Sequence, residues 1–148
     1  MPARQFLTEK EEQQIIDAIA EAEGKTSGEV RIHIEHHCEG DPLERAAEIF
    51  HELGMDETHF QNGVLIYVAT EDHKVSVYAG KGIHKKVDNG FWDDVLKLIV
   101  QHFKEDAYEQ GLEEAIRKVG NKLTELFPYH QKGDINELTD EISYNANT

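Results

Sequence analysis

Apolar and polar positions follow two different periods along this chain, and together they predict a protein of mixed helices and strands. In four segments the apolar residues recur three or four positions apart, which is the spacing of one helix face. In three shorter segments they alternate with polar residues or form an unbroken run, which is typical of strands. The predicted helices span about residues 9–23, 42–53, 91–103 and 108–126, and the predicted strands span about residues 30–34, 64–69 and 75–79.

Residues at the helix ends support these boundaries. Thr8 and Glu11 have the spacing of a capping box at the start of the first helix. Asp41 precedes Pro42, which gives the second helix an N-cap and a first-turn proline. Pro128 ends the last helix, because proline cannot continue the hydrogen-bond ladder and restricts the residue before it.

The connections between the predicted strands fix their directions. The first two strands are joined through a helix, so they run parallel with a right-handed crossover. The second and third are joined by a short turn at residues 71–74, so they form an antiparallel hairpin. The sequence therefore predicts an α/β protein with a small mixed sheet.

These directions bring three distant segments to one edge of the sheet, which we call the glycine rim. The rim comprises residues 27–29, 62–63 and 80–82, and the predicted loop 80–89 leaves from it. The carboxylates, the Asn62 side-chain carbonyl and the backbone carbonyls of the glycine loop suit a hard divalent cation, because calcium and magnesium prefer oxygen ligands. The glycines let the backbone approach a ligand closely. We predict as metal ligands Glu29 and Asp88, and as further binding residues Asn62, Gly80, Lys81 and Gly82. Alternatively, the glycines only form turns and the carboxylates are solvated.

The opposite edge of the sheet is a second candidate site. It collects His36, His37, Cys38 and Glu39 after the first strand, and Asp72 in the hairpin turn. Histidine and cysteine are zinc ligands, but alternate residues of a strand point to opposite faces. The three consecutive side chains therefore cannot converge on one ion without a bend, and the role of this cluster stays open.

The charge of the chain limits its partners. There are 30 acidic residues against 15 basic ones, which gives a formal net charge of −15. A field of that sign repels nucleic acid and anionic membrane surfaces, and it attracts cations. We expect no nucleic-acid partner, and a divalent cation is the favoured ligand.

Length and segment composition predict one domain. The 148 residues suffice for a single hydrophobic core, which we place in residues 1–128, with residues 129–148 as a polar, loosely packed tail. No run approaches the roughly 20 apolar residues that span a bilayer, and no signal-peptide stretch opens the chain. The single cysteine excludes an intramolecular disulfide. We therefore expect a cytoplasmic protein without direct membrane insertion.

The order and spacing of three motifs resemble those of the TPM domain family. The motifs are Ser27-Gly28-Glu29-Val30-Arg31, Asn62-Gly63-Val64-Leu65-Ile66 and Val77-Tyr78-Ala79-Gly80-Lys81-Gly82-Ile83. Downstream, Asp88 stands where the family has an acidic residue before a long helix, and the segment 103–111 is similar to a family motif of Phe, Tyr and Gly. The resemblance covers about residues 8–128.

The resemblance implies an α/β/α sandwich whose small mixed sheet is flanked by four main helices. It also implies an acidic pocket for divalent cations, with calcium first and magnesium second, at Glu29, Asn62, Gly80, Gly82 and Asp88. Acid phosphatase activity has been assigned to some plant members of the family. Three functions follow as hypotheses: a calcium-binding module, a metal-dependent acid phosphatase-like hydrolase in which Lys81 neutralises developing charge, and a protein-interaction scaffold that uses the glycine rim.

Overall fold

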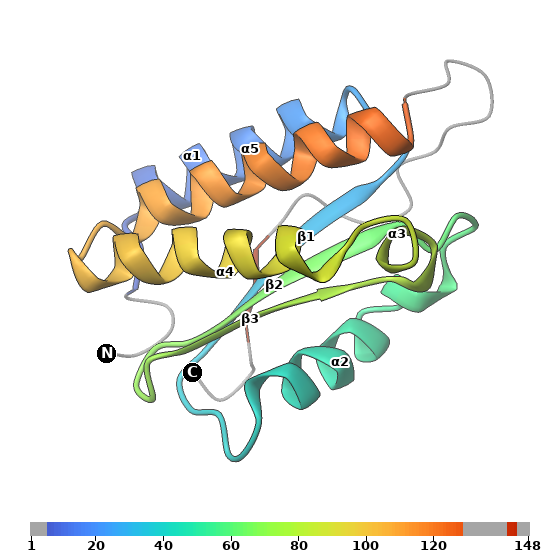
Figure 1. Cartoon of the computed structure of the whole chain (residues 1–148). Coiled ribbons are helices and arrows are strands. Elements are labelled where there is room, and N and C mark those ends of the chain that lie inside the picture. The colour runs from blue at the N-terminus through green and yellow to red at the C-terminus, as the bar shows by residue number, and fades with distance from the viewer. Residues whose placement is uncertain (1–5, 129–141, 145–148) are drawn as a thin grey trace.

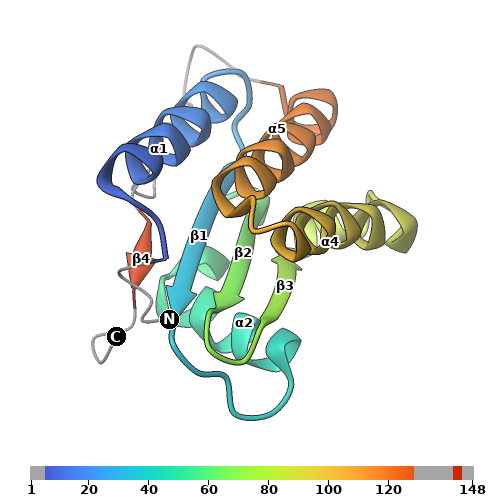
Figure 2. The same ribbon diagram turned by 90° about the vertical axis from the view of Figure 1, so that its left-hand side faces the viewer.

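Three layers of secondary structure make up the computed structural model, which describes residues 6–128 and 142–144 (Figure 1). The helices are α1 (Glu9–Glu23), α2 (Pro42–Glu52), the 3-10 turn η2 (Met55–Glu57), α3 (Lys81–His84), α4 (Asn89–Lys104) and α5 (Tyr108–Leu126). The strands are β1 (Glu29–Glu35), β2 (Gly63–Ala69), β3 (Lys74–Ala79) and β4 (Ser143–Tyr144). Helices α1, α4 and α5 cover one face of the sheet and α2 covers the other (Figure 2). The predicted α/β sandwich is confirmed.

The sheet has the strand order β3-β2-β1-β4. Strands β1 and β2 are parallel and β2 and β3 are antiparallel, as the connections predict. Strand β4 pairs in parallel with the other side of β1, through Ser143 and Tyr144. Most of the segment that the sequence assigns to a polar tail lies outside the described residues, but its residues 142–144 lie against the domain.

The expected helix boundaries are present. At α1 the Thr8 hydroxyl accepts from the Glu11 amide at 3.1 Å and the Glu11 carboxylate accepts from the Thr8 amide at 2.9 Å, which is a full capping box. The Asp41 side chain caps α2 by accepting from the Leu43 amide. The prediction of an irregular loop over residues 80–89 is wrong in part, because α3 forms one short helical turn within it.

The two faces of the sheet bury different kinds of residue. Val30, Ile32 and Ile34 of β1 face α1, α4 and α5 in the larger core. The opposite face packs Leu65 and Tyr67 of β2 against α2 in a smaller core. Polar residues of β1 share that second face, so α2 buries charges as well as apolar side chains. Among the described residues, no helix combines the length and the apolarity needed to cross a membrane.

Candidate functional site

The backbone of the glycine rim converges as the strand directions require. The Gly80 N–H donates to the Gly63 carbonyl at 2.8 Å, and the Gly82 N–H donates to the Gln61 carbonyl at 2.8 Å. On the other side, the Glu29 N–H donates to the Asn62 carbonyl at 3.4 Å. The three segments therefore touch one another directly, through main-chain hydrogen bonds.

The rim glycines are needed where the chain approaches itself. A Cβ atom on Gly82 would lie 2.0 Å from the Phe60 carbonyl oxygen, and one on Gly80 would lie 2.5 Å from the Gln61 carbonyl oxygen. No real side chain tolerates such distances, so these positions exclude every residue except glycine unless the backbone moves. The space that the sequence suggests for a ligand at these two glycines is occupied by the loop before β2. Lys81 between them is exposed.

The two predicted metal carboxylates lie on different faces of the sheet. Glu29 is 4% exposed and pairs in register with Gly63, whose Cβ position faces Met55 and Phe50 on the α2 side. Asp88 is exposed and caps α4, which covers the opposite face, and its carboxylate accepts from the Phe91 amide at 3.1 Å. The rim therefore gathers backbone, and it separates these two side chains.

Asn62 is the other buried polar residue of the rim, with 1% of its surface exposed. Its side-chain amide lies 3.4 Å from the Ser27 hydroxyl, which links the start of β2 to the segment before β1. Asn62 and Glu29 thus flank one main-chain hydrogen bond, at the point where β1 and β2 begin.

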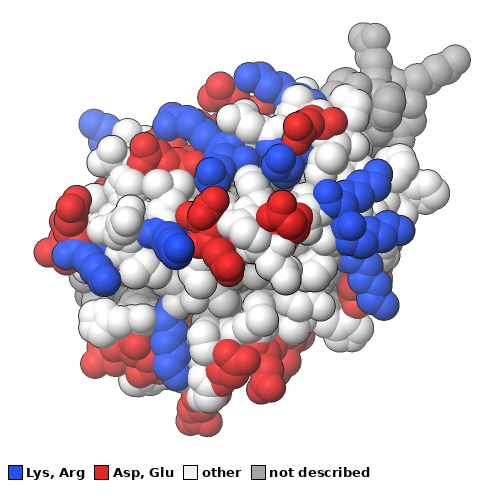
Figure 3. Space-filling view, in the orientation of Figure 1, with Lys and Arg blue, Asp and Glu red and all other residues white. Residues whose placement is uncertain are grey.

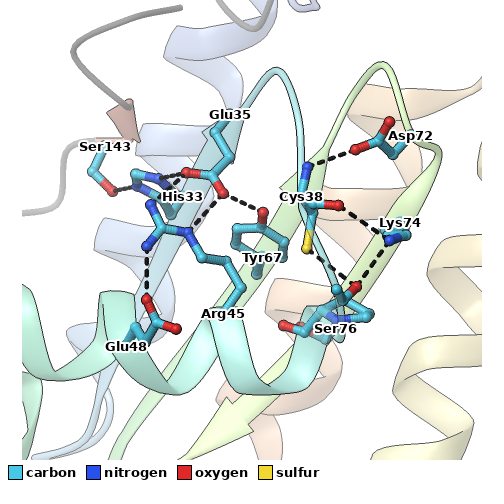
Figure 4. Close-up of polar contacts among 12 residues, drawn as sticks. His33, Glu35, Cys38, Arg45, Glu48, Tyr67, Asp72, Lys74, Ser76 and Ser143 are labelled. Atoms are coloured by element: carbon cyan, nitrogen blue, oxygen red, sulfur yellow. Dashed lines mark hydrogen bonds and ion pairs between the residues drawn. The ribbon is translucent and has the colours of Figure 1, made fainter.

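The opposite edge of the sheet forms an open hollow between two loops, the one after β1 and the β2–β3 turn. Its lining comprises His37, Cys38, Glu39, Asp72 and Lys74, and we call it the loop hollow. The Asp72 carboxylate accepts from the Cys38 amide at 2.6 Å. The Lys74 ammonium donates to the carbonyl of Cys38 at 3.1 Å and to that of Gly40 at 2.8 Å (Figure 4). Two backbone carbonyl oxygens therefore contact a positive charge at this edge, and the Asp72 carboxylate lies nearby on the Cys38 amide.

The loop after β1 turns its carbonyls into the hollow through an unusual backbone conformation. Gly40 has φ +91°, which is in the left-handed region that glycine adopts without strain. His73, in the facing turn, has φ +54°. The sequence indicates the histidines and the cysteine as the candidate ligands at this edge. In the structure the Cys38 side chain is buried, and the backbone around it faces the hollow.

The Asp72 carboxylate is the charged group of the hollow that accepts a backbone hydrogen bond. The hydrogen bond from the Cys38 amide holds the pKa of Asp72 below its ordinary value, with smaller contributions from His37 and Lys74. A carboxylate that accepts from a backbone amide is stabilised in its charged form.

Acidification is expected to weaken the link between the two loops. Because the pKa of Asp72 is lower in the folded state, its carboxylate stabilises the fold above the unfolded pKa of about 3.9. That contribution is lost as the pH falls through the folded value. We expect the Asp72 side-chain carboxyl resonance in NMR to titrate below about pH 3.9, and Asp72→Asn to make the free energy of unfolding less dependent on pH in that range. A midpoint at or above the unfolded value would contradict the argument.

A buried ionic network lies beside the loop hollow, at the end of β1. The Glu35 carboxylate is 2% exposed and accepts from Arg45 of α2 at 2.9 Å and 3.0 Å (Figure 4). The Tyr67 hydroxyl donates to the same carboxylate, and His33 Nε2 lies 3.2 Å from it. The other nitrogen of His33 lies 2.8 Å from the hydroxyl of Ser143 in β4. The Glu35 carboxylate thus links β1, β2 and α2 directly, and it reaches β4 through the ring of His33.

The Glu35 carboxylate and burial shift the pKa values of two residues in this network. Burial, together with the hydrogen bond to Glu35, raises the pKa of Tyr67, and the hydrogen bond to Glu35 raises that of Arg45. Tyr67 therefore stays a neutral donor and Arg45 a cation at any physiological pH. The sequence gives little sign of the network, because Glu35 falls on the face of β1 that alternation predicts to be partly polar.

No group of three or more His, Cys, Asp or Glu side chains in the described part of the chain is arranged to hold a metal ion. A cation at either edge would therefore depend on backbone carbonyl oxygens for part of its coordination. Calcium accepts such ligands readily, whereas zinc prefers nitrogen and sulfur side chains.

Comparisons with known proteins agree with this fold. A sequence model described as the TPM domain matches residues 2–122. The chain is similar to the BA42 protein of the psychrophilic bacterium Bizionia argentinensis, solved by NMR, with 47% identity, a TM-score of 0.87, and coverage of 95% of this chain and 96% of that one. No curated protein matches this sequence.

Two more distant solution structures share the fold alone. The N-terminal domain of a P. gingivalis protein has 18% identity and a TM-score of 0.69, over 85% of this chain and 83% of that one. The N-terminal domain of the cg2496 protein from Corynebacterium glutamicum has 13% identity and a TM-score of 0.63, over 79% of this chain and 74% of that one.

Proposed function

This chain belongs to the TPM domain family, and from that premise we propose that it is a divalent-cation binding module with calcium as its first candidate ligand. The single observation that carries the proposal is the contact of the Lys74 ammonium with the carbonyl oxygens of Cys38 and Gly40, beside the Asp72 carboxylate. These oxygens are the ligand types that a hard cation takes in place of water. A net charge of −15 favours the accumulation of cations at such a surface.

In this proposal calcium and Lys74 compete for the same oxygens. The Cys38 and Gly40 carbonyls and the Asp72 carboxylate would hold the ion, and Glu39 in the lining would add a further carboxylate. Calcium would displace the Lys74 side chain into solvent and tie the β2–β3 turn to the loop after β1. Magnesium is the weaker candidate, because it requires a nearly ideal octahedral shell, whereas calcium accepts carbonyl oxygens in more varied geometries.

The glycine rim is the alternative place for the ion. Asn62 and Glu29 lie together there, and the carbonyls of Gln61 and Gly63 already accept hydrogen bonds from the Gly80–Gly82 segment. Because Asp88 caps α4 on the opposite face, an ion at this rim would use one of the two predicted carboxylates. The loop hollow therefore offers the better arranged oxygen donors.

A calcium titration of the full chain tests the proposal. We expect the melting temperature to rise with the logarithm of free calcium, which corresponds to about 2.7 kcal/mol of stabilisation at 100 times Kd. Amide resonances should shift at residues 36–41 and 70–74. Asp72→Asn should weaken binding by about tenfold or more, and Lys74→Met should tighten it about threefold by removing the competing ammonium. Asp17→Asn, an equal charge change at an exposed position of α1, should leave the affinity unchanged.

Three outcomes separate the alternatives. Shifts confined to residues 27–29, 61–63 and 80–90 would move the ion to the glycine rim. Unchanged resonances and an unchanged melting temperature at millimolar calcium would contradict the module itself. Phosphatase turnover that disappears in Asp72→Asn or Glu29→Gln would favour the hydrolase, whereas turnover that survives both would indicate a contaminant.

A further inference from the structure

We propose that the open edge of β3 binds an extended, basic segment of a partner protein as an additional strand. Strand β3 is the last strand of the sheet order and pairs only with β2 among the described residues. In Figure 1 it runs between α4 and α2 with its outer side uncovered by either helix, and Figure 2 shows the same edge at the border of the sheet. A sheet edge of this kind presents unpaired backbone donors and acceptors.

The register of the hairpin identifies which groups face outward. In an antiparallel pair, opposite residues alternate between hydrogen-bonded and non-bonded positions. The hydrogen bond from Gly80 to Gly63 and the pairing of Leu65 with Tyr78 set this alternation. Val75, Val77 and Ala79 therefore direct their N–H and C=O groups away from β2, toward the open edge.

Beyond Lys74 at its start, whose ammonium donates to the carbonyls of Cys38 and Gly40, this edge carries no charge, proline or bulge to protect it. The segment from Val75 to Ala79 contains no charged residue and no proline, and its pairing with β2 runs through six consecutive pairs without a bulge. Native edge strands are usually shielded by one of these devices, because an open edge recruits other chains. On the other side of the sheet, β4 covers part of the edge of β1. The lack of protection over the segment from Val75 to Ala79 favours a strand that is covered in its working state.

The walls beside the edge form a groove of about 550 Å³. On the α2 side it is lined by Pro42 and by Leu43, a large apolar side chain that is 48% exposed. On the α4 side it is lined by Trp92 and Leu96. A strand added to β3 would lie between these walls, about 4.8 Å from it, and its alternate side chains would contact one wall and then the other. In this mode of binding, main-chain hydrogen bonds supply the affinity and the contacts of alternate side chains supply the specificity.

The acidic residues of this groove favour a positively charged partner segment. Asp41 and Asp93 are among its lining residues, and no lysine or arginine is among the described residues that line it. Figure 3 shows acidic side chains over α4 and over α2 on this face with mainly uncharged surface between them, and basic side chains beside α3 and toward the β2–β3 turn. A second copy of the chain would bring a further charge of −15 to the same surface, which opposes edge-to-edge pairing of two copies. A segment with lysine or arginine between apolar residues matches both the walls and the charge.

The test uses a blocked peptide of about eight alternating valines and lysines, added to the full chain. We expect the amide resonances of Val75, Val77 and Ala79 to shift, and their hydrogen exchange to slow, with a Kd below about 1 mM that rises with salt. Asp93→Lys should weaken binding about threefold. Asp94→Lys, the same charge change at an exposed neighbour outside the groove lining, should have a smaller effect.

Two control peptides make the result decisive. A peptide of valines and glutamates keeps the strand pattern and reverses the charge, and a fully N-methylated valine-lysine peptide keeps the charge and loses its backbone donors. Both should fail to shift the three amides. Equal binding of either control, shifts located elsewhere, or no shift at 1 mM peptide would overturn the proposal. Shifts of the same amides that depend on protein concentration without peptide would show a second copy on the edge, and they would also overturn it.

Discussion

Replacing Glu35 by alanine is expected to lower the free energy of unfolding by about 3–5 kcal/mol. The Glu35 carboxylate is 2% exposed and accepts hydrogen bonds from Arg45 and from the Tyr67 hydroxyl. Its removal leaves the Tyr67 hydroxyl buried without this acceptor and Arg45 without its buried counter-ion. Breaking a buried pair on one side costs far more than the pair contributes, because the remaining group keeps its desolvation cost.

The matched control is Glu48→Ala. Glu48 contacts the same Arg45 at 3.1 Å, but its side chain is 63% exposed, so its removal should change stability by less than about 0.5 kcal/mol. Urea unfolding followed by circular dichroism measures both variants. A triple replacement of Glu35 by leucine, Arg45 by methionine and Tyr67 by phenylalanine should recover most of the loss, because it removes the Arg45 charge and the Tyr67 hydroxyl together with the carboxylate. His33 Nε2 then loses its contact with Glu35. A loss below about 1 kcal/mol in Glu35→Ala would mean that water replaces the carboxylate at low cost.

The helices and the central strands could be predicted from the sequence because their signals are local. The capping box at Thr8 and the Asp41-Pro42 pair mark helix starts within a few residues, and the structure begins α1 and α2 there. The parallel and antiparallel pairings also follow locally, from the length of each connection. Strand β4 could not be predicted, because two residues paired with a strand more than 100 positions away leave no periodic pattern.

The chemistry of the two edges could be predicted only in part. It depends on where backbone carbonyl groups point and on which face of the sheet each side chain lies. Topology correctly brought the rim segments together, yet the faces of Glu29 and Asp88 depend on which helix covers which side of the sheet. At the loop hollow, the useful oxygens belong to the backbone at Cys38 and Gly40, and no residue type announces where a carbonyl points. Side-chain patterns indicate candidate edges, and the turn conformations decide which oxygens reach a ligand.

Replacing Gly82 by alanine is expected to destabilise the protein by about 3 kcal/mol in the absence of any ligand. The new Cβ would lie 2.0 Å from the Phe60 carbonyl oxygen and 2.8 Å from that of Gln61, so the α3 segment must move away from the loop before β2. Backbone atoms cannot turn aside as a flexible side chain can, and the hydrogen bond from the Gly82 amide to Gln61 would be strained as well. Thermal and urea unfolding in chelator measure the loss.

Gly24→Ala is the matched control for this substitution. Gly24 ends α1 with φ −66°, and the nearest atoms to its Cβ position lie at 3.5 Å, so alanine fits there and should change stability by less than about 1 kcal/mol. The comparison separates two roles for the rim glycine. If Gly82 serves only to admit an ion, Gly82→Ala would keep full stability in chelator and lose its response to calcium. A large loss in chelator instead means that the glycine is required by the approach of the chain to itself, which is the role that its contacts support.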